Sequence, residues 1–388
     1  MTPHPVFGDA PVTIFERMSG LAREYGAINL GQGFPEDAGP LALRERAADA
    51  VINGWNQYAP SRGLPELRQA VAEHYNRLQH TDLTSDQVLI TSGATEAIAA
   101  SVAAWIRPGD EVIIFEPAYD AYRPLIERAG GVVVPVTLCP PDWAIAVDDL
   151  LRAIGPHTRA VLFNNPMNPA ARMYTAEELA VLARVCVAHD LLVISDEVWE
   201  HVRLGARRHV PLASLPGMAE RTIKIGSAGK MFGLTGWKVG FVCAPAALLD
   251  PVARAHQFLT FATPPLLQTA VAEGLGWDAQ WFEAMAQDLA GRCALLRDAL
   301  VAQGFHCLDS DGTYFLNIDL AASGIDLGDV DFCETCVREH GIAAIPVSAF
   351  VSQTGQGRIV RLCFAKPEEV LLEAANRLGQ ARKILRNR

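Results

Sequence analysis

Short apolar runs rich in β-branched residues alternate with helical patterns from residue 88 onward. The runs are uniformly apolar, so helices should cover both faces of the sheet that they form. A further run follows a tight TGWK turn and fits an antiparallel strand of the same sheet. The pattern predicts an α/β fold with a mostly parallel sheet. The strand-like runs are residues 88–91, 111–116, 132–136, 160–165, 191–196, 222–227 and 239–244, and helical examples are 101–106 and 176–189.

The pattern changes near residue 280. A long helical stretch at 281–300 is followed by strand-like runs at 314–319 and 359–365, whereas the first forty residues are rich in Gly and Pro. We therefore predict three parts: an arm at residues 1–40 that packs on the small domain, a large domain at 41–280, and a small α+β domain at 281–388.

Charge and composition narrow the classes of partner. The 388-residue chain has a formal net charge of -11, which disfavours nucleic acid because phosphate binding needs a basic surface. No apolar run reaches the length of a membrane span, and Asp9, Glu16 and Arg17 interrupt the start where a signal peptide would be apolar. The eight scattered cysteines suit core packing rather than disulfides. We expect a cytoplasmic protein with no membrane or nucleic-acid partner.

Two motifs invite other interpretations. Cys333 and Cys336 would share a helix face with His340, but a zinc site would lack a fourth ligand, so helix packing is the favoured interpretation. Gly31 and Gly33 supply the first half of a dinucleotide-binding GxGxxG, but Glu36 replaces the third glycine. That segment neither follows a predicted strand nor opens a helix, which disfavours a dinucleotide site.

Polar residues that suit catalysis follow several of the predicted strands. Lys230 lies in a loop of small residues after 222–227, with Ser227 before it and Lys238 after it as a hydroxyl and a cation for an anion. Asp196 ends the apolar run 191–196, and Asn168 follows 160–165. The plainer alternatives are a surface lysine, a helix-capping aspartate and an Asn-Pro turn.

Gly93, Ala94 and Thr95 end one strand and open a helix whose free amides would bind phosphate, although a start capped by Thr91 or Ser92 explains them equally well. Tyr119, after a third strand, is placed to stack on a ring or to fill the core. A lysine, an acid, an amide and an anion cradle at the carboxyl ends of strands are the groups that pyridoxal 5'-phosphate chemistry requires.

A set of motifs in order along the chain resembles the class I aminotransferases. Within them the chain is most similar to the branch of kynurenine aminotransferase, glutamine transaminase K and methionine aminotransferase. The resemblance implies the type I fold of pyridoxal-phosphate enzymes, with a seven-stranded sheet. It also implies transfer of an amino group from an aromatic, methionine, glutamine or kynurenine-like L-amino acid to a 2-oxo acid. The motifs are INLGQGFP, YAPSRGLPELRQAV, SGATEA, EPAYDAY, NNPMNP, ISDEV, SAGKMFGLTGWKVG and RLCFAKPEE.

The resemblance also assigns roles to individual residues. It implies a Schiff base of the cofactor on Lys230, and a homodimer in which each subunit completes the site of the other. The implied roles are Asp196 at the pyridine nitrogen, Asn168 at the phenolic oxygen and near the substrate, Tyr119 stacking on the ring, Gly93, Ala94, Thr95, Ser227 and Lys238 at the phosphate, Tyr58 at the phosphate of the neighbouring subunit, Arg361 and Gly33 at the substrate carboxylate, and Phe15 and Phe261 in an apolar substrate pocket.

The chain departs from the family pattern at two places. Trp199 stands where the family usually has tyrosine, and an indole donates one hydrogen bond but neither accepts one nor ionises. Tuning of the cofactor-bound lysine is therefore the feature most in question. Ala170 and Ala171 replace the Thr-Gly of the usual NPTG turn, a change that we expect to be mild.

Two other functions fit the same motifs. A β-lyase acting on cysteine conjugates would use the same residues and differ only in which bond breaks after proton loss. A cofactor-sensing DNA-binding regulator would carry a helix-turn-helix ahead of the fold, but the family arm is expected to begin within the first dozen residues. We therefore favour the aminotransferase.

Overall fold

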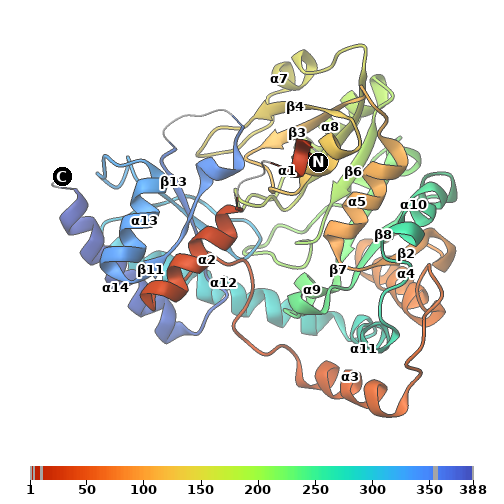
Figure 1. Cartoon of the computed structure of the whole chain (residues 1–388), viewed down its shortest axis with the longest axis horizontal. Coiled ribbons are helices and arrows are strands. Elements are labelled where there is room, and N and C mark those ends of the chain that lie inside the picture. Colours follow the sequence, from red (N-terminus) through yellow and green to blue (C-terminus); the bar gives the residue numbers. More distant parts are fainter. Residues whose placement is uncertain (1, 3–4, 9–11, 353–356, 387–388) are drawn as a thin grey trace.

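The structure, a computed structural model, describes residues 2, 5–8, 12–352 and 357–386. Its centre is a seven-stranded sheet with the strand order β2-β8-β7-β6-β5-β3-β4 (Figure 1). The strands are β2 (Val88–Thr91), β3 (Glu111–Glu116), β4 (Val132–Thr137), β5 (Thr158–Asn164), β6 (Leu192–Asp196), β7 (Thr222–Ser227) and β8 (Gly240–Cys243).

The sheet is parallel except at β8, which runs antiparallel to both β2 and β7. The predicted α/β fold class, including the antiparallel strand after the TGWK turn, is therefore confirmed. The register aligns Asn164 with Asp196, and Asp196 with Ile225. The carboxyl ends of β5, β6 and β7 consequently reach the same edge of the sheet.

Helices cover both faces of the sheet, which explains why its strands are uniformly apolar. Ile114, Leu162 and Ile194 pack on the face covered by α5, α6 and α10, whereas Phe163 and Val193 pack with α7 and α8 on the other face. Helices α4 and α11 cover the β2–β8 end of that second face. The helices of this region are α3 (Leu41–Asn53), α4 (Pro65–Gln79), α5 (Ala94–Trp105), α6 (Tyr122–Arg128), α7 (Val147–Arg152), α8 (Ala176–Ala188), α9 (Ala228–Met231), α10 (Ala246–Leu259) and α11 (Pro265–Leu275).

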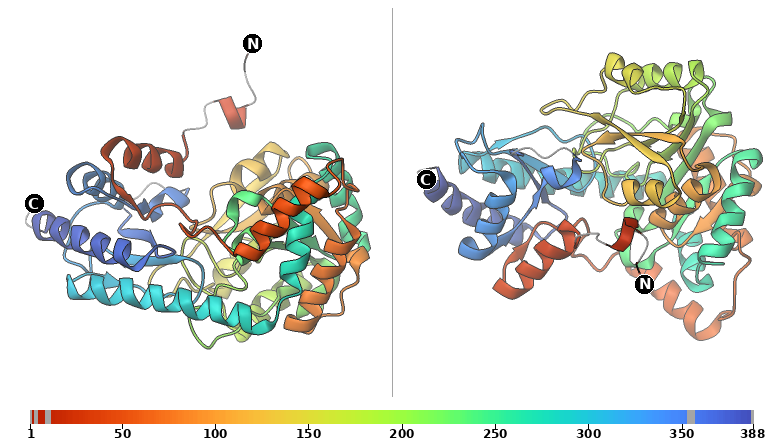
Figure 2. Two further views of the ribbon diagram at one scale, coloured as in Figure 1. Left: turned by 90° about the horizontal axis from the view of Figure 1, so that it is seen from below. Right: turned by 45° about the horizontal axis from the view of Figure 1, so that its top comes forward.

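A second sheet, antiparallel and four-stranded, has the order β12-β13-β10-β9. The long helix α12 links the two regions, because Phe282 near its start packs with α4 and α11 while Leu296 and Leu300 pack with β10 (Figure 2). The elements are α12 (Ala279–Ala302), β9 (His306–Cys307), β10 (Phe315–Asp319), α13 (Asp329–His340), β11 (Ile342–Ala343), β12 (Ile345–Pro346), β13 (Ile359–Cys363) and α14 (Glu368–Leu385).

The N-terminal segment lies against the C-terminal elements. Helix α2 (Ile14–Tyr25) packs on α13, and the short strand β1 (Ile28–Asn29) pairs in parallel with β11. Beyond these, the structure has α1 (Pro5–Gly8) and the short 3-10 helices η1 (Ser85–Gln87), η2 (Leu212–Ser214), η3 (Ala219–Arg221), η4 (Thr235–Trp237) and η5 (Val347–Phe350). The division into an arm, a large domain and a small domain at residues 40 and 280 stays a prediction.

Two sequence-based alternatives can be examined against the fold. The expectation that no strand precedes the GQG segment is wrong, because β1 ends two residues before Gly31. No helix follows this segment until Leu41, however. The segment therefore lacks the strand-turn-helix arrangement of a dinucleotide site. Cys333 and Cys336 are buried in α13, and no third described His, Cys, Asp or Glu side chain forms a possible metal site with them. None of the helices in the described part is long and apolar enough to span a lipid bilayer.

Candidate active site

A cavity of about 180 Å³ lies at the carboxyl ends of β5, β6 and β7 and at the start of α5. Ten of the fifteen residues singled out from the sequence line it. This is the edge where open α/β sheets bind their ligands. Its walls are Gly93, Ala94, Thr95, Ile98, Tyr119, Tyr122, Asn164, Asn168, Asp196, Val198, Trp199, Ser227, Gly229, Lys230, Thr235 and Lys238.

Lys230 lies in the short helix α9, directly after β7. Ser227 caps this helix, accepting a hydrogen bond from the Lys230 amide (3.4 Å), and the Tyr314 hydroxyl donates to the Lys230 carbonyl (2.6 Å). The Lys230 amine donates to the Gly33 carbonyl oxygen (3.1 Å). Burial lowers the pKa of Lys230 to about 8, so a sizeable fraction of the amine is neutral and nucleophilic near physiological pH.

Asp196 ends β6 and is almost fully buried. Its Oδ2 accepts a hydrogen bond from the Tyr122 hydroxyl (2.6 Å), and its Oδ1 accepts one from the Val198 amide (3.3 Å). Burial raises the pKa of Asp196 to about 6, although the bond from Tyr122 opposes the rise. The bond from the Val198 amide is a local contact of the kind that a helix-capping aspartate makes, but no helix follows Asp196. Among the described residues, no cationic side chain forms an ion pair with Asp196.

Two asparagines connect the ends of β5 and β6. The Asn164 side chain donates to the Asp196 carbonyl (2.8 Å) and accepts from the Asn168 amide (2.7 Å). This double contact fixes the turn that carries Asn168 relative to the strand that carries Asp196. The backbone of Asn168 is thus held at the cavity wall by a side-chain hydrogen bond in addition to the Asn-Pro turn.

The start of α5 presents backbone amides to the cavity. Gly93 is the N-cap residue of α5, and no side chain caps the helix. The alternative in which Thr91 or Ser92 caps the helix start is therefore wrong. Gly93 has a φ of 84°, a conformation that favours glycine. A Cβ atom at Gly93 would lie 3.3 Å from Nζ of Lys238, which shows that this amine borders the helix start. Free amides and an ammonium group together suit a phosphate.

The rings of Tyr119 and Trp199 form part of the cavity wall. Tyr119 is partly buried and lies edge-to-face with Tyr122, at 5.6 Å between ring centroids. Trp199 is buried against Tyr314 and Phe315, at 4.7 and 5.5 Å. The indole therefore fills the expected tyrosine position with a ring face rather than a hydroxyl.

Arg361, on β13, lies beside the cavity and is fully buried. Its guanidinium donates to Asn168 Oδ1 (2.7 Å) and to the Gly31 carbonyl (2.8 Å), while its buried Nε has no hydrogen-bond partner among the described residues. Phe315 lies 3.8 Å from the guanidinium carbon and Phe15 lies 5.2 Å from it, both measured to ring centroids. Burial lowers the pKa of Arg361 to about 10, which leaves it cationic at neutral pH.

Gly33 touches the site in a different way. Its carbonyl binds the Lys230 amine, and a Cβ atom there would lie 2.8 Å from the Phe315 ring. Glycine thus lets the segment after β1 approach both the amine and the aromatic wall. This places Gly33, like Arg361 and Phe15, at the border of the cavity rather than in its lining.

Tyr58 and Phe261 do not line the cavity of this chain. Their rings contact each other edge-to-face at 5.3 Å, and both are exposed, with 81% of Tyr58 accessible. An apolar pocket formed by Phe15 and Phe261 within a single chain is therefore not observed.

Several residues that line the cavity were not predicted from the sequence. Tyr122 lies three residues after Tyr119 in the same EPAYDAY motif, so a second aromatic on that turn was a usable signal. Asn164 sits at the end of β5, by the same rule that singled out Asp196 at the end of β6. Val198, Ile98 and Thr235 carry no signal of this kind.

The described residues fit pyridoxal 5'-phosphate. Asp196 is a buried carboxylate that, among the described residues, accepts hydrogen bonds from a neutral hydroxyl and an amide and forms no ion pair, so a protonated ring nitrogen would supply a cation for it. The uncapped start of α5 with Lys238 fits a phosphate, and Lys230 supplies a partly neutral amine. These features lie around one cavity.

Comparison with known proteins identifies the family. The family "Aminotransferase class I and II" matches residues 25–378. Methionine aminotransferase of Escherichia coli (strain K12) is 40% identical over 370 residues, 95% of each chain. A probable N-succinyldiaminopimelate aminotransferase of Mycobacterium tuberculosis is 43% identical over 379 residues, also 95% of each. Kynurenine–oxoglutarate transaminase 3 of Mus musculus is 35% identical over 393 residues, covering 93% of this chain and 86% of that protein.

Solved structures agree with these matches. An Escherichia coli structure with a methionine aminotransferase function has a TM-score of 0.94 at 39% identity, covering 98% of this chain and 100% of the other. The Mycobacterium tuberculosis N-succinyldiaminopimelate aminotransferase has a TM-score of 0.95 at 42% identity, with the same coverage. Because family, sequence and fold agree over nearly the whole length, the chain belongs to the class I and II aminotransferases and is a pyridoxal 5'-phosphate-dependent enzyme that transfers the amino group of an amino acid to a 2-oxo acid.

Proposed function

We propose that this aminotransferase binds its cofactor through Lys230 and acts on L-amino acids with uncharged, mostly apolar or aromatic side chains. The observation that carries the proposal is a buried guanidinium, that of Arg361, beside a cavity that Lys230 and Asp196 share. Methionine, aromatic, glutamine and kynurenine-like donors are the proposed substrate class.

The proposed chemistry divides among few residues. When bound, pyridoxal phosphate supplies the carbonyl carbon that takes the amino group and a ring that withdraws electrons from the substrate. Asp196 keeps a proton on the ring nitrogen, and Asn168 donates to the phenolic oxygen. Lys230 Nζ takes a proton from the substrate α-carbon and later returns one, a role that suits an amine whose pKa is about 8.

Phosphate binding is assigned to the start of α5 together with the residues after β7. The amides of Ala94 and Thr95, the hydroxyl of Ser227 and the ammonium of Lys238 are the proposed donors. Gly93 is the residue that lets Lys238 approach the helix start. Tyr119 is proposed to stack on the ring, as its place in the wall permits. Trp199 is proposed to pack against the reacting lysine.

Arg361 is proposed to bind the substrate carboxylate. Among the described residues no carboxylate forms an ion pair with this buried arginine, although the charge of Asp120 acts on it. Such a cation is costly to bury, and a substrate carboxylate matches its planar fork in two bonds. Gly33 borders the same place through its carbonyl. The aromatic rings of Phe15, Phe315 and Phe350 lie around the guanidinium, so the proposed side-chain preference is for apolar groups.

The covalent assignment is tested with a Lys230→Ala variant and borohydride. The wild-type enzyme should retain a cofactor label after reduction, and peptide mapping should find that label at position 230. The variant should lose the visible cofactor absorbance above 400 nm and the transaminase activity together. An active, labelled variant would refute the assignment.

Substrate class is tested by a panel of amino acids in single half-reactions, followed through the loss of visible absorbance. Methionine, phenylalanine, glutamine and kynurenine should react faster than aspartate. Fast reaction of N-succinyldiaminopimelate alone would overturn the apolar preference, since that donor has an anionic side chain. Release of pyruvate and ammonia from cysteine conjugates without an added oxo acid would favour the β-lyase alternative.

We also propose a homodimer with shared sites. Phe258 is 86% exposed, and Tyr58 and Phe261 form an exposed aromatic pair, a surface that a second copy would bury. Phe258→Asp should shift the sedimentation of the enzyme from dimer to monomer, whereas Leu372→Asp on the exposed side of α14 should not. If Phe258→Asp leaves the dimer intact, this surface is not the interface.

A reducing compartment, such as the cytoplasm, is proposed as well. All eight cysteines are free thiols, and most of them are buried in the core. Loss of activity after oxidative refolding, but not after refolding with a thiol reductant, would support this location; full activity after both treatments would speak against it.

A further inference from the structure

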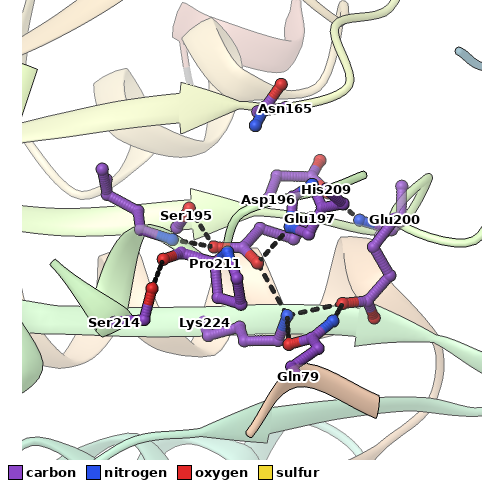
Figure 3. Close-up of polar contacts among 12 residues, drawn as sticks. Gln79, Asn165, Ser195, Asp196, Glu197, Glu200, His209, Pro211, Ser214 and Lys224 are labelled. Atoms are coloured by element: carbon purple, nitrogen blue, oxygen red, sulfur yellow. Dashed lines mark hydrogen bonds and ion pairs between the residues drawn. The ribbon is translucent and has the colours of Figure 1, made fainter. Parts of the chain in front are cut away.

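A group of buried charges lies on the face of the large sheet opposite α5. Lys224, on β7, places its ammonium between two carboxylates (Figure 3). Its Nζ donates to Glu197 Oε2 at 2.6 Å and to Glu200 Oε2 at 2.5 Å. All three residues are at most 5% exposed. A cation and two anions are therefore held away from water, where such groups persist only when they are well paired.

Neutral donors complete the bonding of both carboxylates. Glu197 accepts from the Ser195 hydroxyl (2.9 Å) and the Leu212 amide (3.2 Å) at Oε1. Glu200 accepts from the Tyr75 hydroxyl (2.6 Å) at Oε1 and from the Gln79 amide (2.5 Å) at Oε2. The Lys224 ammonium also lies 4.4 Å from the centroid of the Tyr75 ring. The network is thus nearly saturated, which fixes its members in one geometry.

The same residues superficially resemble a metal site. Glu197, Glu200 and His209 offer ligand atoms within 4.8 Å of one another. The Lys224 ammonium, however, already binds both carboxylates, and a metal ion would leave that buried cation unpaired. Interaction with the carboxylates raises the pKa of Lys224 against the effect of burial. The Lys224 ammonium lowers the pKa of Glu197 to about 2 and also lowers the pKa of Glu200, so Lys224 and both carboxylates are charged. The group is an ion network rather than a metal centre.

The network contacts the turn that follows β6. Asp196 and Trp199 from this turn line the cavity, whereas Glu197 and Glu200 alternate with them and bind Lys224 on the far side. Lys224 itself precedes Ser227 and Lys230 on the same segment. The Glu197 amide also donates to the Ile225 carbonyl (2.9 Å). One ammonium therefore connects the chain segments that carry the proposed acid and the proposed reactive amine.

We propose that Lys224 is a positioning residue for transamination, acting through Glu197 and Glu200 to hold Asp196 and Trp199 in register with Lys230. The proposal rests on the roles assigned above to Asp196 and Lys230. Small displacements of a reacting group lower the rate steeply, so a loosened turn should slow the chemical step more than it weakens substrate binding. A purely structural ion network would instead change only the stability of the protein.

The test compares holoenzymes with Lys224→Met, Glu200→Gln and Asp329→Asn. Glu200→Gln keeps the Lys224–Glu197 pair, so we expect it to fold even if Lys224→Met does not. Asp329→Asn is the matched control, because this buried carboxylate accepts two hydrogen bonds from Ser348 but lies in α13, outside both the turn after β6 and the Lys224 network. Each variant is measured for kcat, for KM of the amino donor and for the visible circular dichroism of the bound cofactor.

We expect kcat to fall at least tenfold in Lys224→Met and about threefold in Glu200→Gln, with KM changed by less than a factor of two. The dichroism of the cofactor should change in both variants and stay unchanged in Asp329→Asn. Unchanged kcat and dichroism in a folded Lys224→Met or in Glu200→Gln would overturn the proposal. The proposed function would fail separately, through a Lys230→Ala variant that keeps the cofactor label.

Discussion

The amine of Lys230 lies 4.6 Å from the centroid of the Trp199 ring. Tyr314 and Phe315 pack edge-to-face against that indole. An ammonium over an indole face gains about 0.5 to 2 kcal/mol, and the larger values apply to desolvated sites such as this one. The tryptophan that replaces the family tyrosine therefore stabilises the charged form of the lysine through its ring face and not through a hydroxyl.

A pair of variants of similar volume isolates this contact. Trp199→Phe keeps an aromatic ring face beside the Lys230 amine, whereas Trp199→Leu removes it. The pKa of Lys230, which is about 8 in the wild type, should therefore fall further in the Leu variant than in the Phe variant. The measurement is the pH dependence of acylation of Lys230 in cofactor-free enzyme, read from the labelled peptide. Equal pKa values in the two variants would show that the ring face has no effect on the amine.

Asp196 should make the cofactor-free enzyme less stable as the pH rises. Its pKa is about 6 in the folded protein and near 3.8 when unfolded, so between these values the folded state binds more protons. The free energy of unfolding then falls with increasing pH through this window, by up to about 3 kcal/mol in total. Asp196→Asn removes the titrating group and should be more stable than the wild type.

The difference in unfolding free energy between Asp196→Asn and the wild type should grow by about 1 kcal/mol from pH 5 to pH 7.5. Urea unfolding at one protein concentration, with cofactor removed, measures it at both pH values. Other titrating groups are common to both proteins and cancel in the difference. A constant difference would mean that Asp196 is ionised throughout and that its burial is offset in another way.

The strand pattern and the positions of strand ends were predictable from sequence, because buried parallel strands leave an uninterrupted apolar signal. Asp196 stood out because it is an acid at the end of an apolar run, and Lys230 because it follows a strand in a loop of small residues between Ser227 and Lys238. The strand β1 was missed because two residues leave no period to detect, and its partner β11 is more than 300 residues away. The resemblance, rather than spacing, supplied Arg361, which lies on a strand of the second sheet.

The network around Lys224 could not be predicted for a different reason. Glu197 and Glu200 follow Asp196 in a stretch that looks like an ordinary charged turn, and Lys224 looks like a polar position in a strand. Only the parallel pairing of β6 and β7 brings the three charges together. The role of Ala171 was equally hidden: it adopts a φ of 60° where the family pattern has glycine, with its methyl group buried in the core.

Gly93→Ala should weaken cofactor binding selectively. The added methyl group would lie 3.1 Å from Cε of Lys238 and 3.3 Å from its Nζ, in a backbone conformation that disfavours alanine. We expect the dissociation constant of pyridoxal phosphate to rise about tenfold, or about 1.4 kcal/mol. Equilibrium dialysis measures this constant directly.

Gly109→Ala is the matched control for that variant. Gly109 has nearly the same φ, 88°, but a methyl group there would meet no atom within 4 Å. Both variants therefore place alanine at a positive φ, and only Gly93→Ala crowds Lys238. Equal cofactor affinity in the two variants would remove Lys238 and the start of α5 from the proposed phosphate site.

Arg361 should distinguish substrates by their carboxylate alone. In Arg361→Met the loss of a buried charged partner should lower kcat/KM for L-methionine by about 10² to 10³-fold, or about 3 to 4 kcal/mol. For the corresponding amine without a carboxylate, 3-(methylthio)propylamine, kcat/KM starts low and should change by less than a factor of three. Arg361→Lys keeps the charge but loses the planar fork, so it should recover only part of the difference between the two substrates. Methionine and this amine share the same side chain and differ in the carboxylate. An equal loss of kcat/KM for both substrates would therefore indicate that the Arg361 variants do not act through carboxylate binding. It would point instead to a disturbed Asn168, to which the guanidinium is hydrogen-bonded at 2.7 Å.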